Sequence, residues 1–154
     1  MNKKTFWILV FFILLSLIGL ADSIYLTYEH YTGAPLVCII TQGCDTVTTS
    51  PQAYIFGVYI AIYGVIYYSL IFFLSLMAIT TNYARSANFY KFLIFLTPLG
   101  FLASLYFLYL QAFVIGTFCT WCLISAIDST LLFILGLYLA NDNHRSHIFV
   151  EDKL

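Results

Sequence analysis

Four cysteines are the residues of this chain that are best suited to chemistry. Cys38 and Cys44 are separated by five residues, and Cys119 and Cys122 form a Cys-x-x-Cys motif. A thiolate attacks a disulfide through a mixed-disulfide intermediate, so two such pairs can exchange electrons with each other and with outside thiols. Whether they do so depends on the elements that position them.

The composition indicates a membrane protein. Of the 154 residues, 62% are hydrophobic and 8% are charged, whereas about a quarter of the residues of a soluble domain are charged. Apolar runs at 6–28, 56–80, 92–115 and 118–140 each exceed the ~20 residues of a spanning helix. Because a backbone in lipid must satisfy its own hydrogen bonds, we predict an all-α integral membrane protein. A four-transmembrane-helix bundle then fills residues 1–154 as one domain.

The first run also resembles a secretory signal, because Lys3 and Lys4 precede it. Its apolar part extends from Phe6 to Ala21, at or beyond the long end for a signal sequence. We therefore expect a retained helix.

The basic residues predict the orientation. All six lie on the N-terminal tail, on the link between the second and third spans, or on the polar tail 141–154: Lys3, Lys4, Arg85, Lys91, Arg145 and Lys153. With four spans these segments share one side, which the positive-inside rule assigns to the cytoplasm together with both termini. The four cysteines then face the opposite side, which is oxidising in bacteria. This predicts a multi-pass protein of the bacterial plasma (inner) membrane, without a basic patch for nucleic acid.

Three interpretations of the cysteines compete. Structural disulfides are the first, although a bond across Cys-x-x-Cys closes too short a loop to constrain the chain much. A four-thiolate zinc site is the second, but zinc folds usually place two to four residues between paired cysteines. The third is a dithiol relay, in which one pair passes electrons to the other. We favour the relay, and we expect no metal.

The start of the fourth span suits this relay. Thr117 is a plausible N-cap, so Cys119 is expected in the first helical turn, where the helix dipole favours a thiolate. Cys122 lies three residues further along the same face, one turn deeper. One sulfur would face water and the other the lipid boundary, where a hydrophobic quinone could accept two electrons.

The chain resembles the vitamin K epoxide reductase family over nearly its whole length. The resemblance rests on "GLADSIYLTYEHY" (19–31), on "CIITQGCDTVTTSPQAYIFGVYIAIYG" (38–64) and on "CTWC" (119–122). The order is specific: Cys-x5-Cys, an Asp after the second Cys, a Ser six residues after it, and then Phe-Gly.

The resemblance implies a role for each cysteine. Cys38 and Cys44 would be the pair that exchanges disulfides with a separate, extracytoplasmic thioredoxin-fold partner. Cys44 would then form a transient disulfide with Cys119, and Cys119 and Cys122 would form the second redox disulfide. Cys122 would lie nearest the quinone, either ubiquinone or menaquinone.

The resemblance also implies roles for residues around the cysteines. Ser50 and Phe56 would lie at the quinone pocket, and the extracytoplasmic loop between the first two helices would form a short lid helix. Vertebrate members have an Asn and a Tyr where this chain has Ala53 and Ala126, so epoxide reduction is not implied. The chain ends soon after the fourth span, which implies a bacterial homologue without a fused thioredoxin-like domain. The alternatives are an oxidase of the disulfide bond formation protein B type, whose cysteine pairs come in the opposite order, and a non-enzymatic four-thiol metal binder.

Some residues in the spans invite a structural interpretation beside a functional one. For Asp22 we expect a structural hydrogen-bonding role, and for Asp128 a neutral or paired state inside the bundle, with proton uptake as the functional alternative. Pro98 is expected to kink the third span, and His30 is expected to be solvated. Small residues at helical spacing are expected to pack against neighbouring helices: Ser16, Gly19, Ser23 and Thr27 in the first span, and Cys122, Ser125 and Ser129 in the fourth.

Overall fold

A computed structural model describes residues 3–33, 36–38, 40, 43–81 and 83–151, with only the backbone described for 83–87 and 142–151. Its long helices are α1 (Lys3–Thr32), α3 (Ile60–Thr80), α4 (Tyr83–Tyr109) and α5 (Thr120–Glu151). A π-helix, η2 (Leu110–Ile115), continues α4. Within the described residues, four segments are long and apolar enough to cross a membrane: Lys3–Thr32, Ile60–Thr80, Asn88–Ile115 and Thr120–Asn141. The predicted four-helix membrane bundle is confirmed.

The helices extend beyond the apolar runs that predicted them. α4 begins at Tyr83 rather than near 92, and α5 continues to Glu151 rather than ending near 140. Hydropathy marks the part of a helix that suits lipid, whereas backbone hydrogen bonding continues into polar residues. The last three residues, with Lys153, lie outside the described residues.

The second helix begins later than predicted because a hairpin precedes it. β1 (Tyr54–Ile55) pairs antiparallel with β2 (Val58–Tyr59). Between the strands, Phe56 has a φ of 50° and Gly57 a φ of 77°. Two successive positive φ angles are typical of a type I′ hairpin turn, so α3 starts at Ile60 instead of at 56.

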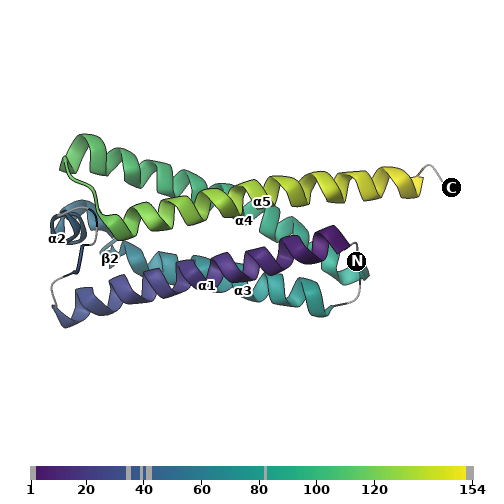
Figure 1. Cartoon of the computed structure of the whole chain (residues 1–154), viewed down its shortest axis with the longest axis horizontal. Helices are drawn as coiled ribbons and strands as arrows, with labels where there is room; N and C mark the ends of the chain where they lie inside the picture. Colours follow the sequence, from purple (N-terminus) through teal and green to yellow (C-terminus); the bar gives the residue numbers. More distant parts are fainter. Residues whose placement is uncertain (1–2, 34–35, 39, 41–42, 82, 152–154) are drawn as a thin grey trace.

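The hairpin belongs to a cap at one end of the bundle. The cap also contains the predicted lid helix, α2 (Cys44–Thr49), and the short helix η1 (Pro51–Ala53). Figure 1 shows α2 and β2 at the end where α5 begins, opposite the N-terminus, the link between α3 and α4, and the C-terminal end of α5. The basic residues within the described part of the chain, Lys3, Lys4, Arg85, Lys91 and Arg145, therefore belong to segments at the end remote from the cap.

Small residues let α1 and α3 pack closely, as the sequence predicted. Ser16 is buried in α1, and a Cβ on Gly19 would collide with the Tyr68 ring of α3. In return, a Cβ on Gly64 of α3 would collide with Ser23. The buried core below the cap joins side chains of all four long helices: Leu9, Phe12, Tyr68, Ile71, Ala78, Tyr90, Leu93, Leu132 and Leu139.

Candidate active site

Cys44 and Cys119 belong to one buried cluster between the cap and the adjoining end of the bundle, and the partly buried Cys38 and Cys122 pack against it. Cys38 and Cys44 form a disulfide, and the Cys44 backbone N–H donates to the Cys38 sulfur at 3.1 Å. Cys119 and Cys122 are thiols. Cys44 and Cys119 are almost completely buried, with exposed fractions of 1% and 0%, so the two pairs meet away from solvent.

Hydrogen bonds hold the loop with the first pair against the start of α5. The Ile40 N–H donates to the Thr120 hydroxyl at 3.3 Å, and the Trp121 indole N–H donates to the Val37 carbonyl at 3.1 Å. The Trp121 ring also packs against Tyr25 of α1, with ring centroids 4.8 Å apart. The residues that flank Cys119 and Cys122 thus position the loop that holds the other pair.

Gly43 allows the closest approach between these segments. A Cβ at this position would lie 2.8 Å from the Phe118 carbonyl oxygen and would collide with the Thr117 side chain. Any larger residue would push Cys44 away from the segment that leads into Cys119.

Cys119 is the N-cap of α5, which corrects the prediction that Thr117 caps the helix and that Cys119 lies in its first turn. α5 begins at Thr120, and the Cys119 carbonyl accepts the first helical hydrogen bond, from Leu123 N–H at 3.1 Å. The chain from Gly116, with a φ of 75°, remains non-helical up to this point. One reason is that the Cys119 N–H already donates to the Gln111 side chain at 2.8 Å.

The N-cap position favours the Cys119 thiolate. A hydrogen bond from the Cys122 thiol is the largest cause that lowers the pKa of Cys119, to about 7. Burial acts in the opposite direction, and the backbone N–H groups of Trp121 and Cys122 add to the lowering. A thiolate that accepts from the second and third residues of a helix takes the place of an N-cap oxygen.

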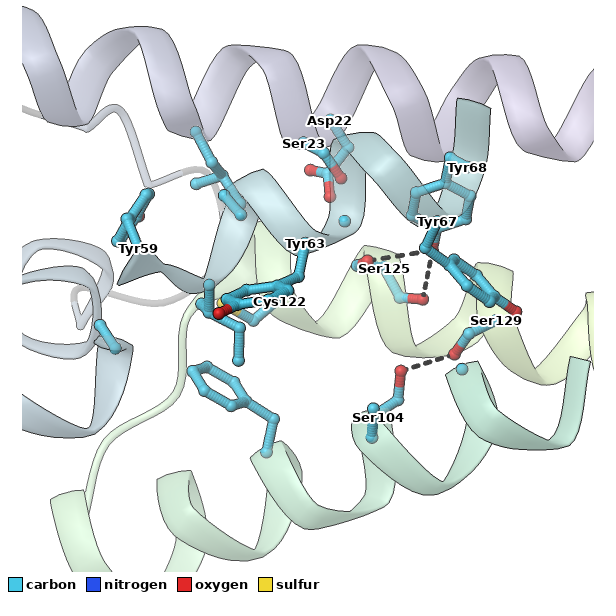
Figure 2. A pocket seen from close by; sticks show the side chains of 18 of the residues that line it. Asp22, Ser23, Tyr59, Tyr63, Tyr67, Tyr68, Ser104, Cys122, Ser125 and Ser129 are labelled. Atoms are coloured by element: carbon cyan, nitrogen blue, oxygen red, sulfur yellow. Dashed lines mark hydrogen bonds between the residues drawn. The ribbon is translucent and has the colours of Figure 1, made fainter. Parts of the chain in front are cut away.

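Cys122 lines a cavity of about 310 Å³ inside the bundle, whereas Cys119 does not. This volume lies at the lower end of the ~300–1,000 Å³ typical of small-molecule sites. The wall combines residues of α1, α2, α3, α4, η2 and α5 and is mostly apolar, with polar groups at a few points. Figure 2 shows two hydrogen-bonded pairs there: Tyr68 with Ser125 at 3.1 Å, and Ser104 with Ser129 at 2.7 Å. The small residues of α5 that were expected to pack against neighbouring helices, Cys122, Ser125 and Ser129, therefore also line the cavity.

Ser50 and Phe56 are not in the cavity wall, which corrects the expectation for both. The Ser50 hydroxyl donates to the Val47 carbonyl at 2.7 Å, at the end of α2. Phe56 is 98% exposed, because the positive φ of the hairpin turn directs its side chain away from the protein. Ala53 and Tyr59, on either side of that turn, line the cavity instead.

Two polar residues of the cavity wall have surroundings that the sequence did not predict. Asp22 is buried and lines the cavity, and neither of its carboxyl oxygens has a hydrogen-bond partner among the described residues. This contradicts the structural hydrogen-bonding role expected for it. Gln111 also lines the cavity, and no motif pointed to it. The only feature of the sequence that could have identified Gln111 is its amide side chain within an otherwise apolar segment.

The other candidate residues lie outside the cavity wall. Asp128 is buried, and neither of its carboxyl oxygens has a hydrogen-bond partner among the described residues, so the paired state is not seen; Pro98 lies inside α4. His30 is part of α1, stacks on Tyr59 with centroids 3.9 Å apart, and bonds the Tyr54 hydroxyl at 2.9 Å. It therefore attaches the hairpin to α1 and is partly exposed, rather than being a free loop side chain.

The described part of the chain contains no group of three or more His, Cys, Asp or Glu side chains arranged as metal ligands.

Comparison with known proteins gives a consistent result. The model of the vitamin K epoxide reductase family matches residues 10–137. The thiol-disulfide oxidoreductase LTO1 of Arabidopsis thaliana is 36% identical over 121 residues, which cover 75% of this chain and 32% of that protein. The chain thus spans about a third of the length of this relative. With its cysteine pairs beneath a cap on four membrane-spanning helices, the chain belongs to the vitamin K epoxide reductase family.

Proposed function

We propose that this protein is a membrane thiol:quinone oxidoreductase that reoxidises a separate thioredoxin-fold protein and reduces a quinone. The observation that carries the proposal is the serial arrangement of the two cysteine pairs. The Cys38–Cys44 disulfide lies in the cap, and Cys122 lies at a small-molecule cavity, with Cys119 buried between them in the same cluster. The name of the Arabidopsis relative, a thiol-disulfide oxidoreductase, supports the thiol half of the reaction.

The proposed electron path has three balanced steps. A dithiol of the partner reduces Cys38–Cys44 and becomes a disulfide. Cys44 then attacks Cys119 in the Cys119–Cys122 disulfide, and Cys38 resolves the mixed disulfide, which regenerates Cys38–Cys44. Finally, Cys119 and Cys122 form their disulfide again as two electrons and two protons pass to the quinone, which leaves as hydroquinone. In this sequence of steps, the form with the Cys38–Cys44 disulfide and the Cys119 and Cys122 thiols would come between the last two steps.

The proposed quinone substrate is of either the ubiquinone or the menaquinone type. An apolar cavity with a few polar groups suits an aromatic ring with two carbonyl oxygens. Of the four sulfurs, only that of Cys122 belongs to the cavity wall, so Cys122 would meet the acceptor.

The proposed location is the plasma membrane of a bacterium, with the cap outside and both termini in the cytoplasm. The support is that the basic residues within the described part of the chain fall at the end remote from the cap. A cysteine introduced within 82–90, where α4 begins, in a variant without the native cysteines, should not react with an impermeant maleimide in intact cells. Labelling from outside would reverse the orientation.

A donor comparison tests the relay. Cys38→Ala should lose quinone reduction when a purified, reduced thioredoxin-fold protein is the donor. With dithiothreitol it should retain most of the activity, because a small dithiol can attack the partly exposed Cys122 sulfur directly. Equal loss with both donors would contradict the order of the relay, and no quinone reduction by the wild type with either donor would contradict the proposed function.

A further inference from the structure

Gln111 connects the redox-active segment to the cavity. Its side chain is 1% exposed, and its Oε1 accepts a hydrogen bond from the Cys119 backbone N–H at 2.8 Å. An amide side chain has one acceptor end and one donor end. Because a backbone N–H requires an acceptor, this bond fixes the amide orientation and leaves Nε2 on the other side.

The donor end is unused. Nε2 of Gln111 is buried and has no hydrogen-bond partner among the described residues, although the residue lines the cavity that Cys122 also lines. A buried donor without an acceptor is unfavourable and uncommon in native structures. Here the cavity is the place from which an acceptor could come.

The local backbone supports a functional interpretation. Gln111 lies in η2, and its carbonyl accepts from Gly116 N–H at 3.0 Å, a bond that spans five residues. Short π-helical segments inside α-helices are rare and occur frequently at functional sites. The segment ends at Gly116, whose positive φ turns the chain toward Cys119.

We propose that Gln111 binds the quinone substrate, donating a hydrogen bond from Nε2 to a carbonyl oxygen while Oε1 holds the backbone of Cys119. This rests on the proposed function and names a residue that recognises its acceptor. The same amide then positions the substrate oxygen and the N-cap sulfur relative to each other. As electrons arrive, negative charge develops on that oxygen, and a fixed donor stabilises it.

Two substitutions of Gln111 test the donor and the acceptor of its amide side chain. Gln111→Glu keeps an oxygen for the Cys119 N–H and replaces the donor, whereas Gln111→Met has a similar length and removes both. Gln52→Glu makes the same chemical change in η1, outside the cavity wall, and serves as the matched control. Thermal unfolding of each purified variant verifies that it is folded.

The measurements are equilibrium binding of a ubiquinone with a short tail to the detergent-solubilised protein, and the infrared carbonyl stretch of that quinone labelled with ¹³C at one carbonyl. In the wild type, one carbonyl stretch should shift to lower frequency on binding. In both Gln111 variants that shift should disappear and the Kd should rise about tenfold, which corresponds to about 1.4 kcal/mol. Gln52→Glu should match the wild type.

The outcomes distinguish this inference from the proposed function. Wild-type affinity and an unchanged carbonyl shift in both Gln111 variants would overturn the role of Gln111 and leave quinone reduction intact. A wild type that neither binds nor reduces the quinone would overturn both. Weaker binding without any change in the carbonyl stretch would show that Gln111 shapes the cavity without donating a hydrogen bond, which also contradicts the proposal.

Discussion

Cys119 and Cys122 lie one helical turn apart, yet they have different neighbours. Cys119 is fully buried at the N-cap of α5, in the same cluster as Cys44, whereas Cys122 lines the cavity inside the bundle. The Cys122 thiol also donates a hydrogen bond that lowers the pKa of Cys119. In the proposed reaction, the motif would therefore place Cys119 next to the first cysteine pair and Cys122 next to the acceptor, with a hydrogen bond between them.

This coupling predicts the pH dependence of Cys119. Because the pKa is lowered from 9.0 to about 7, the thiolate is present above pH 7 and is lost as the pH falls below it. In a Cys38→Ser/Cys44→Ser background, the ultraviolet absorbance of the Cys119 thiolate, which needs no reagent to reach the buried sulfur, should change with a midpoint near pH 7. Replacing Cys122 with Ala removes the main hydrogen-bond donor, so the midpoint should move toward 9.0. An unchanged midpoint would show that the helix N-terminus alone stabilises the thiolate.

Gly43→Ala should impair the exchange between the two pairs. The added Cβ collides with Thr117 and the Phe118 carbonyl, so Cys44 moves away from the segment that leads into Cys119. Turnover with a reduced thioredoxin-fold donor should fall at least tenfold, while turnover with dithiothreitol stays near the wild-type rate. Thr46→Ala is the control for a substitution in the cap, since Thr46 is exposed on α2. Similar rates for Gly43→Ala and wild type with the protein donor would refute the steric argument.

Asp22→Leu should stabilise the protein without quinone. The carboxyl group is buried and has no partner among the described residues, and such a group costs about 1–3 kcal/mol. The apparent thermal unfolding temperature in detergent, followed by circular dichroism, should therefore rise. Asp45→Ala should lower it, because Asp45 accepts a hydrogen bond from the Leu36 N–H at 3.1 Å. A lower unfolding temperature for Asp22→Leu would mean that the carboxyl group has a stabilising partner, such as bound water.

The two cysteines of the motif should differ in their spectra with bound quinone. In Cys119→Ser the Cys122 sulfur remains at the cavity, and its thiolate next to a quinone should give a charge-transfer absorbance band. Cys122→Ser should give no band, because neither sulfur of the motif then lies in the cavity wall. In this variant the mixed disulfide between Cys44 and Cys119 can form only by attack of the Cys119 thiolate on Cys38–Cys44, and no Cys122 thiol is present to displace Cys44 from it. The opposite pattern would mean that Cys119 is the sulfur nearer the acceptor.

The sequence alone predicted the features that depend on local composition. Four apolar runs predicted four spanning helices, because lipid requires long apolar segments with internal hydrogen bonds. The cysteine spacing, with Asp45 and the Phe-Gly pair, predicted the family, and Ser16 and Gly19 predicted close helix packing. Each of these depends on residues that are near one another in the chain.

The tertiary structure decided which side chains surround the cavity. Phe56 fits the family pattern, but the hairpin turn exposes it, and Ser50 bonds within the cap. Gln111 and Asp22 stand eighty-nine positions apart in the sequence, and only the packing of η2 and α1 around a common space makes both part of one wall. Hydrophobic periodicity reports which face of a helix is buried, but not whether that face meets another side chain or a space for a ligand, because that depends on how the helices pack together.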